Sequence, residues 1–148
     1  MCGIVAYIGK KQAFPIVLKG LKRLEYRGYD SAGIAYLQGD HIEVTKRAGK
    51  LSELGKALFE TPKIAQLAIA HSRWATHGGP TNENAHPHYD QFERVAIIHN
   101  GIIENYEPLK KELLKRGYTF TSDTDTEVLV NLIEDVQKKD NLKQFSML

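Results

Sequence analysis

The first apolar segment of the chain, residues 3–9, holds only apolar residues and one tyrosine between two glycines. A compact run of this kind is typical of a strand that is covered on both faces. Two further compact segments, and two segments that flank a Gln-Gly-Asp-His turn, also favour extended structure and a hairpin. The sequence therefore predicts strands at residues 66–71 and 94–99 and hairpin arms at 34–37 and 42–46.

Helical spacing of apolar residues begins at Ala13, where Val17, Leu21 and Leu24 recur on one face, and Gly28 supplies a stop. Similar spacing predicts three more helices, and Thr124 and Glu127 have the separation of a capping box at the start of the last one. The four predicted helices span residues 13–26, 51–60, 106–117 and 125–138.

A polar segment rich in glycine and proline, residues 72–89, separates two of the predicted strands. Long loops in compact domains are usually functional or disordered, and this one carries aromatic and imidazole groups. We interpret it as a binding loop. Strands and helices of the predicted lengths, packed in layers, indicate an α+β fold.

Composition narrows the class of protein. The 148 residues include 42% hydrophobic and 26% charged residues, as in a single globular domain. A net charge of +2 favours neither nucleic acid nor an anionic membrane as a partner. The longest apolar run is too short to cross a bilayer, and Lys10 and Lys11 interrupt any secretory signal. We expect a cytoplasmic protein without membrane association.

The only cysteine is Cys2, directly after the initiator methionine. If Met1 is removed, Cys2 carries both a thiol and a free α-amino group. The amine titrates near about 7.7–8.0 and the thiol near about 8.5, so the amine can act as base for the thiol. The alternative interpretation is that Cys2 is a small buried hydrophobic residue.

A cysteine that attacks an acyl group needs hydrogen-bond donors where the oxyanion develops. Asn100 and Gly101 follow an apolar segment and offer a side-chain amide and an unhindered backbone N–H. Asn-Gly is also a very common turn sequence, so the pair taken alone fits an ordinary turn better than an oxyanion hole.

Six motifs occur in an order that resembles the glutaminase domain of glutamine:fructose-6-phosphate aminotransferases, a branch of the class II glutamine amidotransferases. They cover residues 1–5, 24–33, 70–78, 84–88, 99–105 and 122–127. The resemblance implies a type-2 glutamine amidotransferase domain over residues 1–148, with the layered α/β/β/α sandwich of the N-terminal-nucleophile enzymes.

The resemblance also implies roles for individual residues. Cys2 would attack the side-chain amide of glutamine, and Asn100 and Gly101 would form the oxyanion hole. Arg73 would bind the α-carboxylate of the substrate, and Asp125 its ammonium group. The remaining matches are two residues of the substrate-covering loop, a gate on the ammonia path and two residues that support the terminal cysteine: Thr76, His77, Trp74, Arg27 and Gly28.

Several of these residues have structural alternatives. Arg73 fits an ordinary surface arginine, and Trp74 fits a core residue. Asp125 lies in the first turn of a predicted helix, where an acid is favoured by the helix dipole whatever its function. It is the joint order of the motifs that favours the functional interpretation.

Five histidines between residues 71 and 99 suggest a rival, a metal-dependent hydrolase. No His-Glu-x-x-His pair at helical spacing supports it, and the sequence contains neither a phosphate-binding loop nor a dinucleotide glycine fingerprint. We expect no metal and no cofactor. The five are His71, His77, His86, His88 and His99.

The sequence also departs from the family. Nothing in it corresponds to the sugar-isomerase domain that binds fructose 6-phosphate and produces glucosamine 6-phosphate, and residues 141–148 match no family segment. We therefore expect a truncated sandwich, incomplete at its C-terminus, in which the apolar faces of residues 4–8 and 95–98 are partly exposed. An inactive fragment or scaffold is a further alternative.

Overall fold

A four-stranded antiparallel sheet forms the centre of the first half of the chain. The computed structural model describes residues 1–60, 64–76 and 78–139. In the sheet the strands have the order β1-β4-β2-β3. The elements of this half are β1 (Gly3–Ile8), α1 (Ala13–Leu24), a 3₁₀ turn η1 (Glu25–Arg27), β2 (Ser31–Gln38), β3 (His41–Ala48), α2 (Leu51–Phe59) and β4 (Leu67–Arg73).

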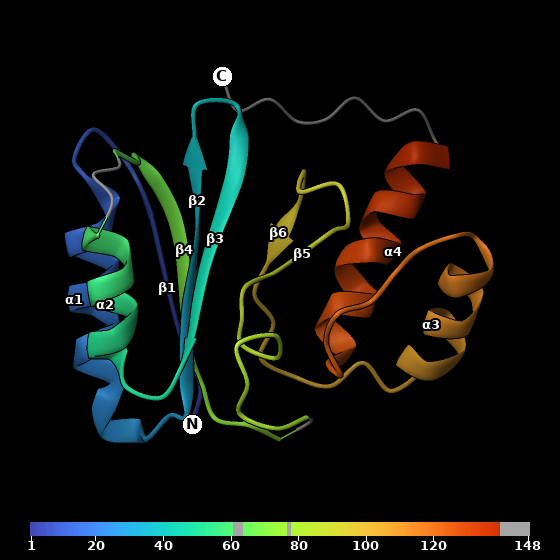
Figure 1. Cartoon of the computed structure of the whole chain (residues 1–148), viewed down its shortest axis with the longest axis horizontal. Coiled ribbons are helices and arrows are strands. Elements are labelled where there is room, and N and C mark those ends of the chain that lie inside the picture. The colour runs from blue at the N-terminus through green and yellow to red at the C-terminus, as the bar shows by residue number, and fades with distance from the viewer. Residues whose placement is uncertain (61–63, 77, 140–148) are drawn as a thin grey trace.

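The second half adds two short strands and two helices on the other side of this sheet. Figure 1 shows four layers in succession: α1 with α2, the four-stranded sheet, the β5–β6 pair, and α4 with α3. The elements of this half are β5 (His88–Tyr89), β6 (Ala96–Ile97), α3 (Tyr106–Lys115) and α4 (Asp125–Lys139). The α/β/β/α arrangement expected from the sequence is thereby confirmed.

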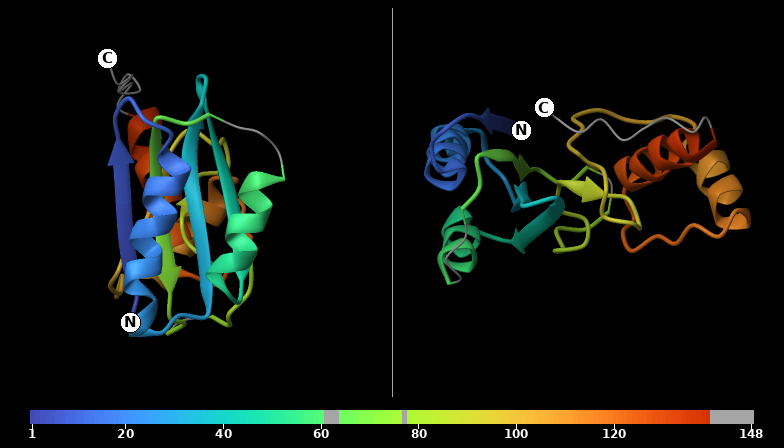
Figure 2. Two further views of the ribbon diagram at one scale, coloured as in Figure 1. Left: turned by 90° about the vertical axis from the view of Figure 1, so that its left-hand side faces the viewer. Right: turned by 90° about the horizontal axis from the view of Figure 1, so that it is seen from above.

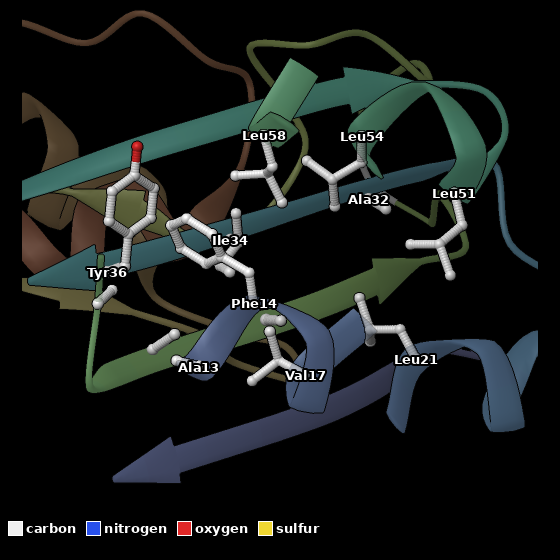
Figure 3. Packing of buried hydrophobic residues seen from close by; sticks show 13 residues of the cluster. Ala13, Phe14, Val17, Leu21, Ala32, Ile34, Tyr36, Leu51, Leu54 and Leu58 are labelled. Atoms are coloured by element: carbon white, nitrogen blue, oxygen red, sulfur yellow. The ribbon is translucent and has the colours of Figure 1, made fainter. Parts of the chain in front are cut away.

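The main core lies between the sheet and the helices α1 and α2, which Figure 2 shows side by side on one face of the sheet. Phe14 of α1 meets Tyr36 of β2 edge to face, with ring centroids 4.8 Å apart. Leu54 and Leu58 of α2 point into the same space (Figure 3). Burial of these large side chains fixes both helices on the sheet.

Strand alternation gives β4 two different faces. Ala68 and Ala70 point into the helix-covered core, whereas His71 and Arg73 both point to the other face of the sheet. That second face is directed toward the β5–β6 layer. The alternation therefore separates a packing face from a face that carries polar chemistry.

A smaller cluster joins α3 to α4 around Leu113, Tyr118 and Val128, all of them buried. The Thr124 hydroxyl accepts the backbone N–H of Glu127 at 3.4 Å, as a helix cap should. The reciprocal half of the predicted capping box is replaced, because the Glu127 carboxylate accepts the backbone N–H groups of Thr121 and Ser122. Glu127 thus ties the backbone segment before α4 to the first turn of that helix.

Most predicted elements are confirmed, and two expectations about strands are wrong. β1 is an edge strand that is open on one face, since Ile4 and Ile8 are 46% and 68% exposed. The strand predicted at residues 94–99 is regular only at Ala96–Ile97. The partial exposure expected for residues 4–8 and 95–98 is observed, because Val95 through Ile98 are half-buried.

The long loop is shorter than the sequence indicates, because Ser72 and Arg73 extend β4 and His88 and Tyr89 form β5. His77 and the tail at 141–148 lie outside the described residues. No helix within the described ranges is both long enough and apolar enough to cross a lipid bilayer.

Candidate active site

Cys2 lies immediately before β1, beside the end of β4. Gly3 pairs with Ser72 in the antiparallel register, so Cys2, one residue before Gly3, lies beside Arg73, one residue after Ser72. The Cys2 Sγ accepts the backbone N–H of Trp74 at 3.3 Å, and the thiol is 3.7 Å from the Trp74 carbonyl oxygen. Two strand ends therefore hold the sulfur in place.

A small pocket opens beside this sulfur. It includes six of the residues that the sequence singled out, together with three histidines from β4 and from the segments before β5 and after β6. Its lining consists of Cys2, His71, Arg73, Trp74, Thr76, His86, His99, Asn100 and Gly101. Segments that are far apart in the sequence thus meet around one thiol.

The N-terminus is anchored next to the pocket by the segment that precedes β2. The Met1 ammonium donates to the carbonyl oxygens of Arg27 at 2.8 Å and of Gly28 at 3.3 Å. Gly28 has a positive φ of 76°, and a Cβ on it would lie 3.1 Å from the Trp74 ring. Arg27 and Gly28 do not line the pocket, but they hold Met1 and leave room for Trp74.

Arg73 is buried although it is charged, with only 4% of its surface exposed. Its guanidinium donates to the carbonyl oxygens of Gly79 at 3.2 Å and Gly78 at 3.5 Å. A buried planar guanidinium on the pocket wall has the geometry to pair with a carboxylate. The alternative of a surface arginine is therefore wrong.

The loop after Arg73 is tied down at both ends. The Asp30 carboxylate accepts the backbone N–H of Ala75 at 2.6 Å. Asn84 donates its side-chain amide to the Gly79 carbonyl at 3.1 Å and accepts the Asp123 backbone N–H at 2.9 Å. These bonds fix the loop that contributes Thr76 to the pocket.

Trp74 is 53% exposed, so it is not the core residue that the structural alternative describes. Its ring lies against Gly28 at the mouth of the site, while its backbone contacts Cys2. Trp74 therefore belongs to the pocket lining and has an exposed indole, and a gating role stays a prediction.

Asp125 is buried at the start of α4 and does not line the pocket. Its Oδ2 accepts the backbone N–H of Ile103 at 2.7 Å. The bond ties the segment after Gly101 to the last helix. The helix-terminal alternative is therefore realised in the structure, and a substrate contact by Asp125 stays a prediction.

Asn100 and Gly101 lie at the exposed rim of the pocket. The Asn100 Oδ1 is 2.8 Å from His71 Nε2. A Cβ on Gly101 would come within 2.8 Å of the His99 ring, so only glycine allows the backbone to lie this close. An amide and a free N–H on the rim can together face a developing negative charge.

Three of the histidines form a ladder of rings behind the rim. His71 stacks on His86 with centroids 4.7 Å apart, and His86 meets His88 edge-on at 4.6 Å. Burial lowers the pKa of His71 to about 4, against the raising effect of the bond to Asn100 and with the help of the Arg73 charge. Burial also lowers the pKa of His86 and His88, so all three rings are neutral at pH 7.

The metal-site alternative finds no geometric support in this ladder. Within the described ranges, no three His, Cys, Asp or Glu side chains are arranged to hold a metal ion together. The ring contacts and the Thr124 hydroxyl, 2.9 Å from His88 Nε2, give the histidines a packing role.

The sequence interpretation missed His71, His86 and His99 as pocket residues. Strand alternation offers a signal for the first, because His71 precedes Arg73 by two residues and must share its face. His86 and His99 lie in irregular segments, where no periodicity indicates the direction of a side chain.

Comparison with known proteins identifies the family. Residues 40–146 match the model of the glutamine amidotransferase domain. The chain is 58% identical over 135 residues to the glutamine–fructose-6-phosphate aminotransferase [isomerizing] of Bacteroides thetaiotaomicron, and 55% identical over 135 residues to that of Pyrococcus horikoshii. The alignments cover 90% and 91% of this chain but only 22% and 23% of those proteins.

Solved structures agree with this assignment. The glutamine phosphoribosylpyrophosphate amidotransferase from B. subtilis, complexed with ADP and GMP, superimposes with a TM-score of 0.73 at 31% identity. The match covers 90% of this chain and 29% of that one. The chain spans between a fifth and a quarter of the length of the curated relatives named above. Fold, pocket and sequence together show that the chain belongs to the glutamine amidotransferase domain family.

Proposed function

We propose that this chain hydrolyses the side-chain amide of glutamine with Cys2 as the nucleophile, after loss of Met1. The sulfur attacks the amide carbon, and the tetrahedral intermediate expels ammonia as it takes up a proton. The resulting glutamyl thioester is cleaved by water to glutamate, which regenerates the thiol. The freed α-amine of Cys2 accepts the thiol proton and returns it to the leaving nitrogen.

The observation that carries this proposal is the shared pocket of Cys2, Asn100 and Gly101. A cysteine nucleophile alone is not sufficient, because the transition state needs donors at the oxyanion. Removal of one such donor typically lowers kcat about 100- to 1,000-fold. Asn100 Nδ2 and the Gly101 N–H supply two donors on the rim beside the sulfur.

The other site residues bind the substrate and control access. Arg73 pairs with the α-carboxylate from the pocket wall. Asp125, which lies outside the pocket lining, accepts the substrate ammonium. Trp74 covers the mouth and gates the ammonia path. Thr76 and His77 cover the substrate from the loop, and Arg27 and Gly28 hold the N-terminus.

We propose further that the ammonia is destined for fructose 6-phosphate, bound by a sugar-isomerase domain, to give glucosamine 6-phosphate. The names of the relatives support this, since they are glutamine–fructose-6-phosphate aminotransferases that are four to five times longer than the matched part. No nucleic acid or membrane takes part. We assign the reaction to the cytoplasm, whose reducing conditions preserve a single thiol such as Cys2.

The test is release of ammonia and glutamate by the purified chain, with the loss of Met1 verified by mass. Hydrolysis should disappear in Cys2→Ala. It should also disappear when one alanine is inserted between Met1 and Cys2, which keeps the thiol but blocks its α-amine. Hydrolysis that survives Cys2→Ala contradicts the nucleophile assigned here, and hydrolysis that survives the insertion contradicts the α-amine of Cys2 as its base.

Two alternatives give different outcomes in the same experiment. An inactive scaffold releases no ammonia and is not labelled at Cys2 by an electrophilic glutamine analogue. A metal-dependent hydrolase loses activity on chelation and is indifferent to Cys2→Ala. Sugar amination is tested separately, by adding an isolated isomerase domain and fructose 6-phosphate to the active chain.

A further inference from the structure

His71 is buried in the middle of the sheet, yet its ring reaches the rim of the pocket. Only 1% of its surface is exposed, and β4 is flanked on both sides, with Ile4 of β1 and Gly33 of β2 opposite His71. Its Nε2 is 2.8 Å from Asn100 Oδ1. Asn100, in contrast, is exposed and follows a two-residue strand, so its own segment gives its amide little support.

Two arrangements of protons satisfy this contact. In one, His71 Nε2–H donates to Asn100 Oδ1. In the other, the Asn100 amide is turned over and its nitrogen donates to an unprotonated Nε2, which leaves the single ring proton on Nδ1.

The surroundings of Nδ1 distinguish the two arrangements. Nδ1 is buried and has no hydrogen-bond partner among the described residues. A buried N–H without an acceptor costs more than a buried lone pair without a donor, so the proton belongs on Nε2. Burial lowers the pKa of His71 to about 4, and a neutral ring carries only this one proton.

The orientation of Asn100 decides what the pocket offers to an oxyanion. With Oδ1 bound to His71, the amide nitrogen Nδ2 is left to face the pocket. With the amide turned over, Oδ1 would face the pocket and repel the developing charge. The orientation of the His71 ring is itself fixed, because the ring stacks on His86 at an interplanar angle of 25°.

We propose that His71 is a positioning residue for glutamine hydrolysis, which fixes the Asn100 amide with its nitrogen toward the oxyanion by donating Nε2–H to Oδ1. The inference rests on the proposed function. His71 touches neither the substrate nor the sulfur in this role. It acts only through Asn100, and this separates it from a general base or a metal ligand.

The kinetic test uses His71→Leu, which removes the donor, and His71→Gln, whose Nε2 can reach the same oxygen. His71→Leu should lower kcat about 10- to 100-fold with KM within about twofold, because the contact acts in the transition state. His71→Gln should recover most of kcat. His41→Gln, at the exposed start of β3, serves as the control for histidine replacement.

A double-mutant cycle with Asn100→Ala isolates the route of the effect. In the Asn100→Ala background, His71→Leu should change kcat by less than about twofold, because the group through which it acts is gone. An equal loss of kcat in both backgrounds overturns the proposal, and so does a kcat of His71→Leu within twofold of the unmodified chain.

A measurement that does not need activity completes the test. In the ¹⁵N spectrum of histidine-labelled protein at pH 7, His71 should be protonated at Nε2 and bare at Nδ1, with the signal assigned by its loss in His71→Gln. A proton on Nδ1 overturns the proposal even if the variants fold poorly. Activity that persists in Cys2→Ala instead overturns the proposed function, and the two failures are therefore distinguishable.

Discussion

The backbone N–H of Ile103 donates to the Asp125 carboxylate at 2.7 Å, and this bond joins the segment after the Asn100–Gly101 rim to the first turn of α4. Asp125 therefore has a structural partner, in addition to the substrate ammonium that we assign to it. Substitutions can separate the two roles, because one needs only an oxygen and the other needs a charge.

Asp125→Asn keeps an oxygen for the Ile103 N–H but removes the negative charge. We expect the free energy of unfolding to fall by less than about 1 kcal/mol, while KM for glutamine rises at least about tenfold through loss of a charge-assisted bond. Asp125→Ala should raise KM similarly and lower the free energy of unfolding by more than Asp125→Asn does, because the half-buried N–H of Ile103 loses its acceptor. An unchanged KM in Asp125→Asn would limit Asp125 to a structural role.

Arg73→Lys tests the guanidinium on the pocket wall. A lysine ammonium keeps the charge but cannot form two parallel bonds to a carboxylate. We expect KM for glutamine to rise about 10- to 100-fold, with a smaller change in kcat. Arg23→Lys, at an exposed position on α1, is the matched control and should leave both constants unchanged. Equal effects of the two substitutions would refute a specific contact with the carboxylate.

Gly33 lies where β2 meets the loop that carries His86, and a Cβ on Gly33 would lie 2.2 Å from the His86 carbonyl oxygen. Gly33→Ala must displace backbone, so we expect a loss of about 1–3 kcal/mol in the free energy of unfolding. Gly55→Ala in α2 meets nothing within 4 Å and should stabilise the chain by about 0.5–1 kcal/mol. Chemical denaturation measures both changes, and an unchanged free energy of unfolding in Gly33→Ala would contradict this prediction.

The buried histidines predict an acid-sensitive fold. Folding lowers the pKa of His71, His86 and His88, so below about pH 6.5 the unfolded chain binds more protons than the folded one. Above about pH 6.5 these histidines do not affect the free energy of unfolding. Below it, the free energy of unfolding decreases as the pH falls toward 4. Each such histidine contributes a slope of up to about 1.4 kcal/mol per pH unit.

His86→Phe keeps a ring for stacking but removes one titrating group from this ladder. We expect the fall in unfolding free energy between pH 6.5 and 4 to become shallower by up to the contribution of one histidine. His41→Gln, at the exposed start of β3, is the matched control for the replacement of a histidine. Equal slopes for the unmodified chain and His86→Phe would mean that His86 becomes protonated without unfolding.

The sequence predicted the helices well because each has an apolar face that needs burial. Val17 and Leu21 of α1 are fully buried, as their spacing indicates. The error at β1 has a physical cause: Ile4 and Ile8 are apolar, but hydrophobicity alone does not show whether anything covers them. The β6 region was predicted too long for a similar reason, since its half-buried residues look like a regular strand.

The site was only partly predictable. Cys2, Asn100 and Gly101 were predicted together because their chemistry is recognisable from residue type and order, and the structure places all three at one pocket. The contact between His71 and Asn100 spans 29 residues, and no local pattern encodes it. Residue type could not decide the role of Asp125, because the first turn of a helix and the binding of an ammonium group both favour an acidic residue.

The pairing of Gly3 with Ser72 has a consequence for how reliably the nucleophile is placed. A slip of β1 by a single residue would turn every β1 side chain to the opposite surface and carry Cys2 away from Trp74. Correct pairing of β1 with β4 therefore also places the sulfur that we propose as the nucleophile, so that only the loss of Met1 has to follow.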